Sequence, residues 1–191
     1  MDAMTRRNLE LTEPIRSDGM HQQSPTLFSE LDHCCTGMGS RLLRHWLHHA
    51  ARKQAVARQR HEAVAELMQM EEIDALRDIL TGIPDIERIV SRIALLSARP
   101  RDLTALRSGL EQLPQLQMAL SQSTSQTGLL AEIRQNLDAP ESCLTLLQQA
   151  VMEEPASMIR DGGVGIAQLL QAFDQRLDAV GAVQQAVFGV Q

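Results

Sequence analysis

Six side chains of the kind that bind transition metals lie close together in the first third of the chain. Zn²⁺ in proteins is held by cysteine thiolates and histidine nitrogens, and His45 and His49 have the i, i+4 spacing that brings two ligands to one helix face. The two cysteines, however, are adjacent and not in a Cys-x-x-Cys pair, so they are poorly placed to converge on one ion. We therefore expect no bound metal and interpret the histidines as solvated or hydrogen-bonded. The six residues are His33, Cys34, Cys35, His45, His48 and His49.

Neither nucleotide hydrolysis nor covalent catalysis has a motif in this sequence. The phosphate-binding loop Gly-x-x-x-x-Gly-Lys-Ser/Thr is missing, and the only lysine, Lys53, has no glycine loop before it to cradle a phosphate. No nucleophile lies at a recognisable spacing from a base, and Asp161-Gly162-Gly163 is typical of a tight turn. We expect no catalytic residue and no cofactor, so the chain is predicted not to be an enzyme.

A stretch of basic side chains is the candidate contact with nucleic acid. No acidic residue occurs from His33 to His61, whereas acids are frequent from Glu62 to Asp78. The formal net charge of −6 argues against a general nucleic-acid-binding protein. Two interpretations stay open: the basic part pairs with the acidic part within the molecule, or it contacts the phosphates of duplex DNA without reading bases. The candidate phosphate contacts are Arg41, Arg44, Arg52, Lys53, Arg58 and Arg60.

The composition predicts packed helices. Apolar residues make up 43% of the chain and aromatic residues only 2%, so the core must be built from aliphatic side chains, which favour helices over sheets. Three cysteines without a disulfide pattern fit a reducing compartment. The N-terminus does not read as a signal peptide, and no apolar run approaches the roughly 20 residues of a membrane span. We therefore expect a cytoplasmic protein without a membrane segment.

Hydrophobic periodicity predicts helices along most of the chain. A short extended segment near the N-terminus and a loop come first. Ser40 is expected to cap a helix that follows a turn between Gly37 and Gly39. The clearest amphipathic helix follows Asp85, and Pro114 is expected to start a new turn. Residues 121–127 read as a polar linker and 155–165 as a loop. The predicted helices span 26–33, 40–49 or beyond, 54–70, 72–80, 86–94, 103–113, 129–137, 141–152 and 166–181.

Four segments of the chain match a known pattern in the same order. They are Asp2-Ala3-Met4-Thr5 with Asn8-Leu9-Glu10, then Ser24-Pro25-Thr26-Leu27-Phe28 through Trp46-Leu47-His48, then Ile83-Pro84-Asp85-Ile86 with Arg99-Pro100-Arg101-Asp102, and last Arg160-Asp161-Gly162-Gly163 with Phe173-Asp174. Each alone is a modest match, but the four together make chance implausible. In this order they resemble the lever (core) domain of MutS, the DNA mismatch-repair ATPase.

The resemblance implies an all-α fold, an irregular bundle of about eight helices with a short extended N-terminal segment. Residues 1–25 would be an entry connector, 26–181 the helical lever-like domain and 182–191 a tail. Ala50 stands where these proteins usually carry a proline, so we expect the preceding helix to run on through Ala51. Phe28-Ser29-Glu30 matches the Phe-x-Glu motif with which MutS stacks on a mispair. Because its neighbours belong to the lever entry, we interpret Phe28 as a buried helix residue.

For function, the resemblance implies DNA mismatch repair. We expect a truncated or stand-alone first segment of the lever, a scaffold that in the whole protein couples mismatched-DNA binding to the ATPase. Duplex DNA would be an indirect partner, through clamp and mismatch-reading domains that this sequence lacks, alongside a homodimer or a MutS-like partner. Two alternatives stay open. One is a helical interaction or oligomerisation module without DNA affinity, with Leu169, Leu170, Phe173 and Leu177 as its exposed apolar face. The other is an inactive gene fragment.

Overall fold

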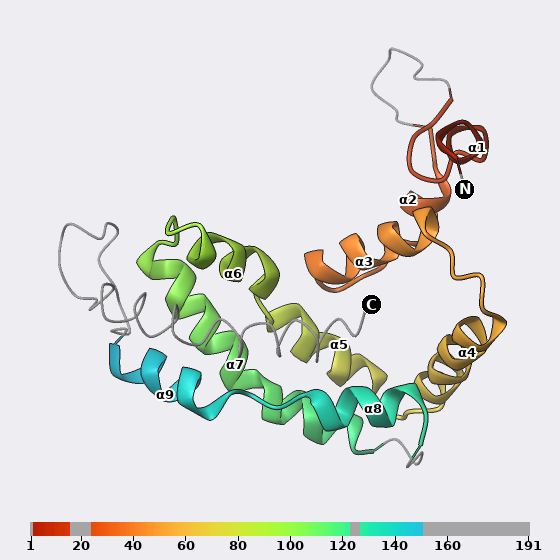
Figure 1. The fold of residues 1–191 in the computed structure, drawn as a ribbon. Coiled ribbons are helices and arrows are strands. Elements are labelled where there is room, and N and C mark those ends of the chain that lie inside the picture. Colours follow the sequence, from red (N-terminus) through yellow and green to blue (C-terminus); the bar gives the residue numbers. More distant parts are fainter. Residues whose placement is uncertain (1, 16–23, 123–126, 151–191) are drawn as a thin grey trace. The chain divides into compact units, whose positions relative to one another are not determined.

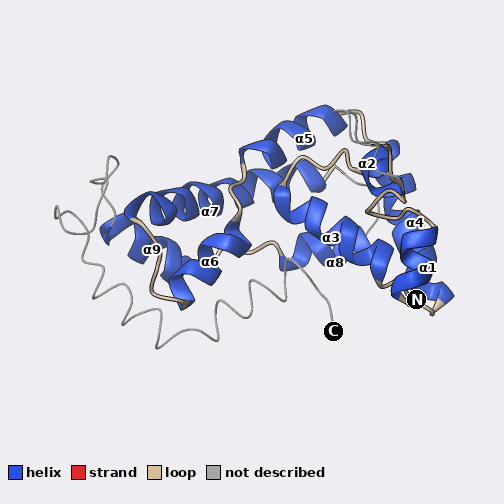
Figure 2. Cartoon of the chain, turned by 90° about the horizontal axis from the view of Figure 1, so that it is seen from above, coloured by secondary structure: helices blue, strands red, loops and turns tan. Residues whose placement is uncertain are grey.

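The computed structural model describes residues 2–15, 24–122 and 127–150, and the regular structure in these ranges is entirely helical (Figures 1 and 2). This confirms the prediction of an all-α fold. No helix in the described ranges combines the length and the apolar character needed to cross a bilayer. The helices are α1 (Ala3–Asn8), α2 (Leu27–Leu31), α3 (Gly37–His48), α4 (Gln54–Met68), α5 (Ile73–Gly82), α6 (Ile86–Ala94), α7 (Pro100–Leu120), α8 (Leu129–Asn136) and α9 (Glu141–Ala150).

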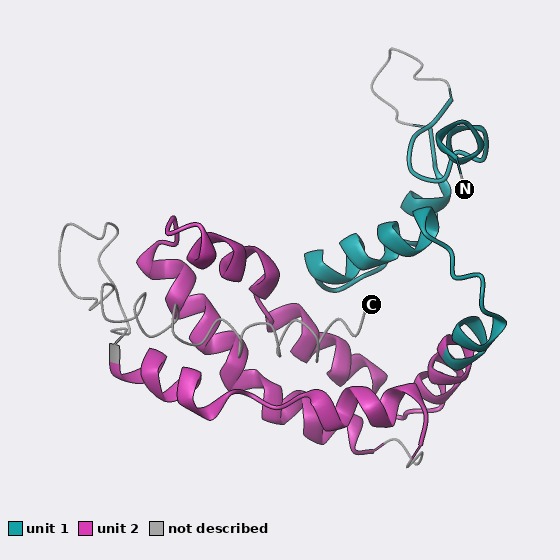
Figure 3. Ribbon diagram, in the orientation of Figure 1, with its two compact units in different colours: residues 1–59 teal, residues 60–191 magenta. Residues whose placement is uncertain are grey.

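The chain divides into two compact units, residues 1–59 and residues 60–191 (Figure 3). The division coincides with a change in charge. Residues 1–59 contain eight Lys or Arg against six Asp or Glu, whereas residues 60–191 contain ten against eighteen. The basic character predicted from sequence therefore belongs to the first unit, and the acidic character to the second.

The first unit opens with a helix where an extended segment was expected, so that expectation is wrong. The side chain of Asp2 accepts a hydrogen bond from the Thr5 backbone N–H at 2.8 Å and caps α1. The helix ends in a Schellman motif, with Glu10 at φ 47° and its N–H donating to the Arg7 carbonyl, while Leu11 donates to the Arg6 carbonyl. The hydrogen bond from the Thr5 backbone to the Asp2 side chain thus stabilises a helix in the segment that was expected to be extended.

The entry to α3 also differs from the prediction. Thr36, not Ser40, caps this helix, because its hydroxyl accepts from the Gly39 N–H at 3.0 Å and draws Gly37 into the first turn. Ser40 lies inside the helix, where its hydroxyl donates to a carboxylate oxygen of Asp32 at 2.5 Å. This bond is the main reason why the pKa of Asp32 is lowered below its ordinary value.

The helix does not run on through Ala51, as expected from the alanine at position 50. It ends at His48, because the N–H of His49 donates to the His45 carbonyl and the backbone then turns away from helical geometry. Residues 50–53 form the non-helical link to α4. In α4, Ala63 is buried, whereas the larger apolar side chains of Val64 and Met68 are 53% and 81% exposed.

The second unit is organised around α7. Helices α5, α6, α8 and α9 all contact it, with α5 and α6 on one side and α8 and α9 on the other in the view of Figure 1. The helix continues through Pro114, where a new turn was expected, so that prediction is wrong. The proline ring is exposed, while leucines on both sides of it are buried, so packing of the apolar face holds the helix together across the missing N–H donor. The buried leucines are Leu103, Leu106, Leu110, Leu113, Leu116 and Leu120.

The junction of α6 and α7 is fixed by a carboxylate. Asp102 is 7% exposed; one oxygen accepts from the Arg99 backbone N–H at 2.9 Å, and the other accepts from the Arg92 guanidinium at 2.8 Å. Asp85, after which a helix was predicted, caps α6 by accepting from the Arg88 N–H at 3.2 Å. The predicted amphipathic character of α6 is confirmed by the burial of its three isoleucines, Ile86, Ile89 and Ile93, whereas Val90 is only half-buried and Ala94 is exposed.

Several predictions fall outside the described residues. They are the loop at 155–165, the helix at 166–181, the tail at 182–191 and the last two residues of the helix predicted over 141–152. The domain boundaries after residues 25 and 181 stay predictions.

Candidate phosphate-contact surface

The basic residues of α3 share one face of the helix. Arg41, Arg44, His45 and His48 follow one another at i, i+3, i+4 and i+7, so their side chains lie along one stripe. The Arg44 guanidinium is 4.3 Å from the centroid of the Phe28 ring, a cation–π geometry. Phe28 is half-buried in α2 beneath this contact, which agrees with a packing role rather than with stacking on a base.

The other predicted phosphate contacts do not form one surface with these. Arg52 and Lys53 are exposed in the link between α3 and α4. Arg58 and Arg60 are two positions apart on α4 and therefore point to roughly opposite sides of the helix, at about 100° per residue. Arg58 is exposed, whereas Arg60 is half-buried and falls in the second unit. The six residues thus separate into a stripe on α3, a pair in the link and two divergent positions on α4.

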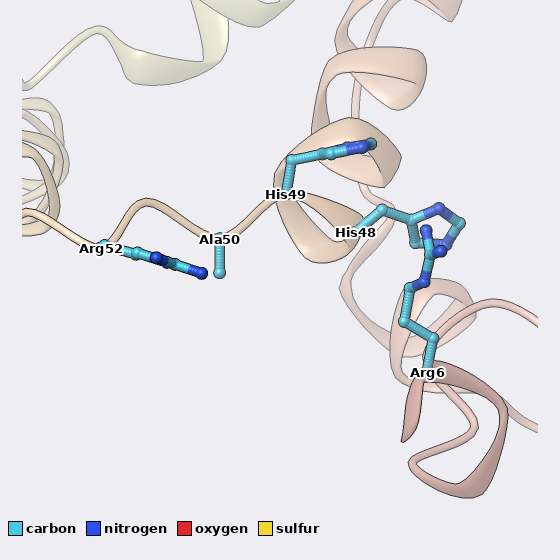
Figure 4. Close-up of a pocket in the computed structure, with 5 residues that line it drawn as sticks. All are labelled: Arg6, His48, His49, Ala50 and Arg52. Atoms are coloured by element: carbon cyan, nitrogen blue, oxygen red, sulfur yellow. The ribbon is translucent and has the colours of Figure 1, made fainter. Parts of the chain in front are cut away.

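A depression of about 450 Å³ brings part of the first unit together (Figure 4). It is lined by Arg6 from α1, by His48 and His49 from the end of α3, and by Ala50 and Arg52 from the link. Sequence reasoning missed Arg6, because the segment around it was expected to be extended. The signal that was available is Asp2, three residues before Thr5, which predicts a capped helix and hence a defined face for Arg6.

The imidazole of His48 is held in place at this depression. Its Nε2 lies 3.0 Å from the hydroxyl oxygen of Thr12. Burial lowers the pKa of His48, and the positive charges of Arg6, His49 and Arg44 lower it further, against a smaller opposing effect of Glu13. These effects favour the neutral ring.

The second histidine of the depression closes the end of α3. The ring of His49 stacks on that of His45, with centroids 4.4 Å apart, and its Nδ1 is 3.2 Å from the His45 carbonyl oxygen. Because a carbonyl oxygen can only accept, Nδ1 must carry the proton in this bond. This contact gives the His45 carbonyl, which also accepts from the His49 backbone N–H, a second donor.

The cysteines and histidines do not assemble into a metal site within the described ranges, where no three His, Cys, Asp or Glu side chains could hold one ion. None of the three cysteines, all of them in the described ranges, forms a disulfide; Cys34 is exposed, and Cys35 and Cys143 are half-buried. Burial raises the pKa of the Cys143 thiol.

Comparison with known protein families gives one match that spans the two units. The family model described as MutS domain III matches residues 4–187, nearly the whole chain.

Proposed function

The chain belongs to the MutS family through its domain III, and from this premise we propose that it acts as the helical lever of a DNA mismatch-repair protein. Domain III is the lever domain of this family and not its ATPase. In the proposed role, its helices carry conformational change between elements that clamp mismatched DNA and the ATPase that responds to them. A cytoplasmic location is part of this proposal, and the three cysteines, which form no disulfide in the described ranges, support such a reducing compartment.

The observation that carries the proposal is the packing around α7. This helix has 21 residues, and at about 1.5 Å per residue it spans roughly 31 Å. Four helices contact it, and its buried face is nearly continuous from Pro100 to Leu120. Close-packed interiors have low compressibility and transmit displacement. A helix held along its length in this way can pass a movement at one end to the other.

Side-chain hydrogen bonds also connect α7 to the helices around it. The Gln112 amide donates to the Gly82 carbonyl at 3.3 Å, the Gln117 amide to the Arg134 carbonyl at 3.3 Å, and the Gln148 amide to a carboxylate oxygen of Glu111 at 2.9 Å. These bonds tie α7 to the end of α5, to α8 and to α9. They fix the register of the neighbouring helices along α7, which a lever requires.

The test of the lever role is made in the cell. We expect deletion of the coding region to raise the spontaneous mutation frequency in a fluctuation assay, and the reintroduced wild-type gene to restore it. A mutation frequency unchanged by deletion would contradict a role in repair and would favour an inactive gene product.

We propose further that the basic side chains of the first unit contact DNA phosphates: Arg41, Arg44, Arg52, Lys53, Arg58 and Arg60. The exposed positions Arg52, Lys53 and Arg58 support this best, because Arg41 and Arg60 are already engaged within the chain. Duplex affinity should then fall with salt, with a slope of about 0.9 per phosphate contact.

The matched variants are the pairs Arg52→Gln/Arg58→Gln and Arg88→Gln/Arg101→Gln, each of which removes two exposed positive charges. The first pair should reduce the salt slope of duplex binding by about 2, and the second should leave it unchanged. Equal slopes for both pairs would contradict the assignment.

A second candidate function is a helical interaction module that forms a homodimer or binds a MutS-like partner. Large apolar side chains exposed on the second unit favour it, notably Leu95, Leu96 and Met118 at 77%, 72% and 76%. Size-exclusion chromatography with light scattering distinguishes a monomer from an oligomer. A mass that rises with concentration supports self-association, and a monomer at all concentrations counts against it.

A further inference from the structure

We propose that the depression lined by Arg6, His48, His49 and Arg52 is an anion site that accepts one phosphate group. The proposal adds three residues to the predicted phosphate contacts, which included only Arg52 of this set. It does not rest on the lever role, because it concerns only the first unit and a ligand of stated chemistry.

The lining supplies nitrogen donors from three separate segments and no carboxylate. Arg6 belongs to α1, the two histidines to the end of α3, and Arg52 to the link. Figure 4 shows the Arg6 guanidinium against the His48 ring, with the side chain of Arg52 extended toward Ala50. An arginine presents a planar fork that pairs with two oxygens of a phosphate, so two arginines at one depression suit a tetrahedral oxyanion better than a halide.

The positive charges of the depression are not balanced from within. Arg6 uses its Nε in a long contact of 3.4 Å to the Asp2 carbonyl, and neither Arg6 nor Arg52 is paired with a carboxylate in the described ranges. Cations held near one another without a counter-charge repel, and a bound anion relieves that repulsion.

The end of α3 opposes an anion, since the C-terminus of a helix carries partial negative charge. Two features reduce this opposition. His49 donates both its backbone N–H and its Nδ1–H to the His45 carbonyl, so two donors lie on the oxygen one turn before the helix end. Arg6 belongs to α1, so its attraction for an anion does not depend on the direction of the α3 dipole. The balance at the depression is therefore cationic.

Anion binding should be linked to the protonation of His48. The charged groups acting on this ring are Arg6 from α1, Arg44 and His49 from α3, and Glu13, while Thr12 bonds its Nε2. An anion placed among them favours the imidazolium, so the pKa of His48 should rise on binding. By linkage, the anion should then bind about two- to threefold more tightly at pH 6 than at pH 8.

The experiment is an NMR titration of the His48 ring protons in the full chain. Sodium sulfate is the probe, because its own charge is constant over this pH range, and sodium chloride at equal ionic strength is the reference. We expect sulfate to raise the pKa of His48. His48→Gln assigns the signal.

A neighbouring residue provides a matched control. Arg6→Gln and Arg52→Gln should abolish the effect of sulfate, whereas Arg7→Gln, adjacent to Arg6 in sequence but outside the lining, should retain it. No effect of sulfate on the wild type, or an equal loss in all three variants, would overturn the proposal. Since Arg52 is exposed in the link, Arg52→Gln carries the test if Arg6→Gln does not fold.

Two further arms identify the source of the phosphate group. The same titration is made with inorganic phosphate and with a short DNA duplex. A duplex effect lost in Arg6→Gln and Arg52→Gln assigns the site to the nucleic-acid backbone, and an effect of free phosphate alone assigns it to a small anion. An effect of neither overturns the site. The lever role fails only if mutation frequency is unchanged by deletion, so the two failures are distinguishable.

Discussion

Among the residues that the structure describes, two with side chains occupy the left-handed conformation that usually selects glycine. Glu10 has φ 47° after α1, and Leu96 has φ 54° after α6. Both lie at the position after a helix C-cap, where a Schellman motif requires this conformation. The motif at Leu96 has the same two bonds as the one at Glu10: the Leu96 N–H donates to the Ile93 carbonyl, and the Ser97 N–H donates to the Arg92 carbonyl. Left-handed geometry costs an L-residue about 1–2 kcal/mol. The chain therefore stores strain at two helix ends.

Leu96→Gly should stabilise the protein. The substitution relieves the strain, gives up little burial because Leu96 is 72% exposed, and loses part of the gain to the greater flexibility of unfolded glycine. We expect a net gain of about 0.5–1 kcal/mol, measured by urea unfolding. The control is Leu95→Gly, next in the chain and 77% exposed but at φ −88°, which should destabilise by up to about 1 kcal/mol. A loss of stability in both variants would contradict the account of strain.

The half-buried thiol of Cys143 allows a test of pH dependence. Burial raises the pKa of Cys143, so at a given pH less of it is thiolate, the form that reacts. In Cys34→Ser/Cys35→Ser, the remaining thiol should react with a disulfide reagent several-fold more slowly in the native state than in urea, and the ratio should narrow as pH rises toward the native pKa. Equal native and unfolded rates at neutral pH would show that Cys143 is not shielded.

Among the elements, α7 depends on a close approach of the turn between α5 and α6. A Cβ atom placed on Gly109 would lie 2.8 Å from Cδ and 2.9 Å from Cγ of Pro84, inside normal contact distance. A proline ring cannot rotate away as a flexible side chain can. At Gly82 the nearest atom is also at 2.8 Å, but it is the amide oxygen of Gln112, the far end of a flexible side chain.

Gly109→Ala should destabilise the second unit despite the better helix propensity of alanine. The propensity gain is up to about 1 kcal/mol, whereas overpacking against a rigid group costs about 1–3 kcal/mol, so we expect a net loss of about 1–2 kcal/mol. Gly82→Ala is the matched control and should be close to neutral, because Gln112 can move. Thermal or urea unfolding gives both values, and a Gly109→Ala variant as stable as the wild type would mean that the turn is not packed as described.

The sequence predicted elements well where a periodic stripe and a local cap agreed. Asp85 and the isoleucines of α6 are the clearest case. The prediction of helix boundaries was wrong where one local signal was considered without the packing or hydrogen bond that competes with it. Pro114 was expected to end a helix that the surrounding leucines hold together, and Ala50 was expected to extend a helix that ends at the His49 cap. Ser40 was expected to be the N-cap, a role that Thr36 takes. In each case, packing or a better-placed hydrogen bond overrides the local preference.

At the scale of the whole molecule, the predicted charge asymmetry follows the structural division, with the basic excess in residues 1–59. The candidate site was only partly predictable. The basic stretch of the sequence identified Arg52 as a candidate. It could not show that Arg6 lies beside His48, because this juxtaposition depends on the path of the chain from α1 to α3. A basic first unit and a helix-packed second unit are both consistent with a scaffold that contacts phosphates and does not read bases.

The most direct test of this account is the affinity of the chain for two duplexes that differ by a single mispair. Fluorescence anisotropy at low salt gives both values of Kd. The account predicts equal affinity for the two duplexes, because phosphate contacts carry no base identity and Phe28 lies beneath Arg44. A preference for the mispaired duplex of about tenfold or more, ~1.4 kcal/mol, would show that this chain senses the mispair itself and would contradict the account.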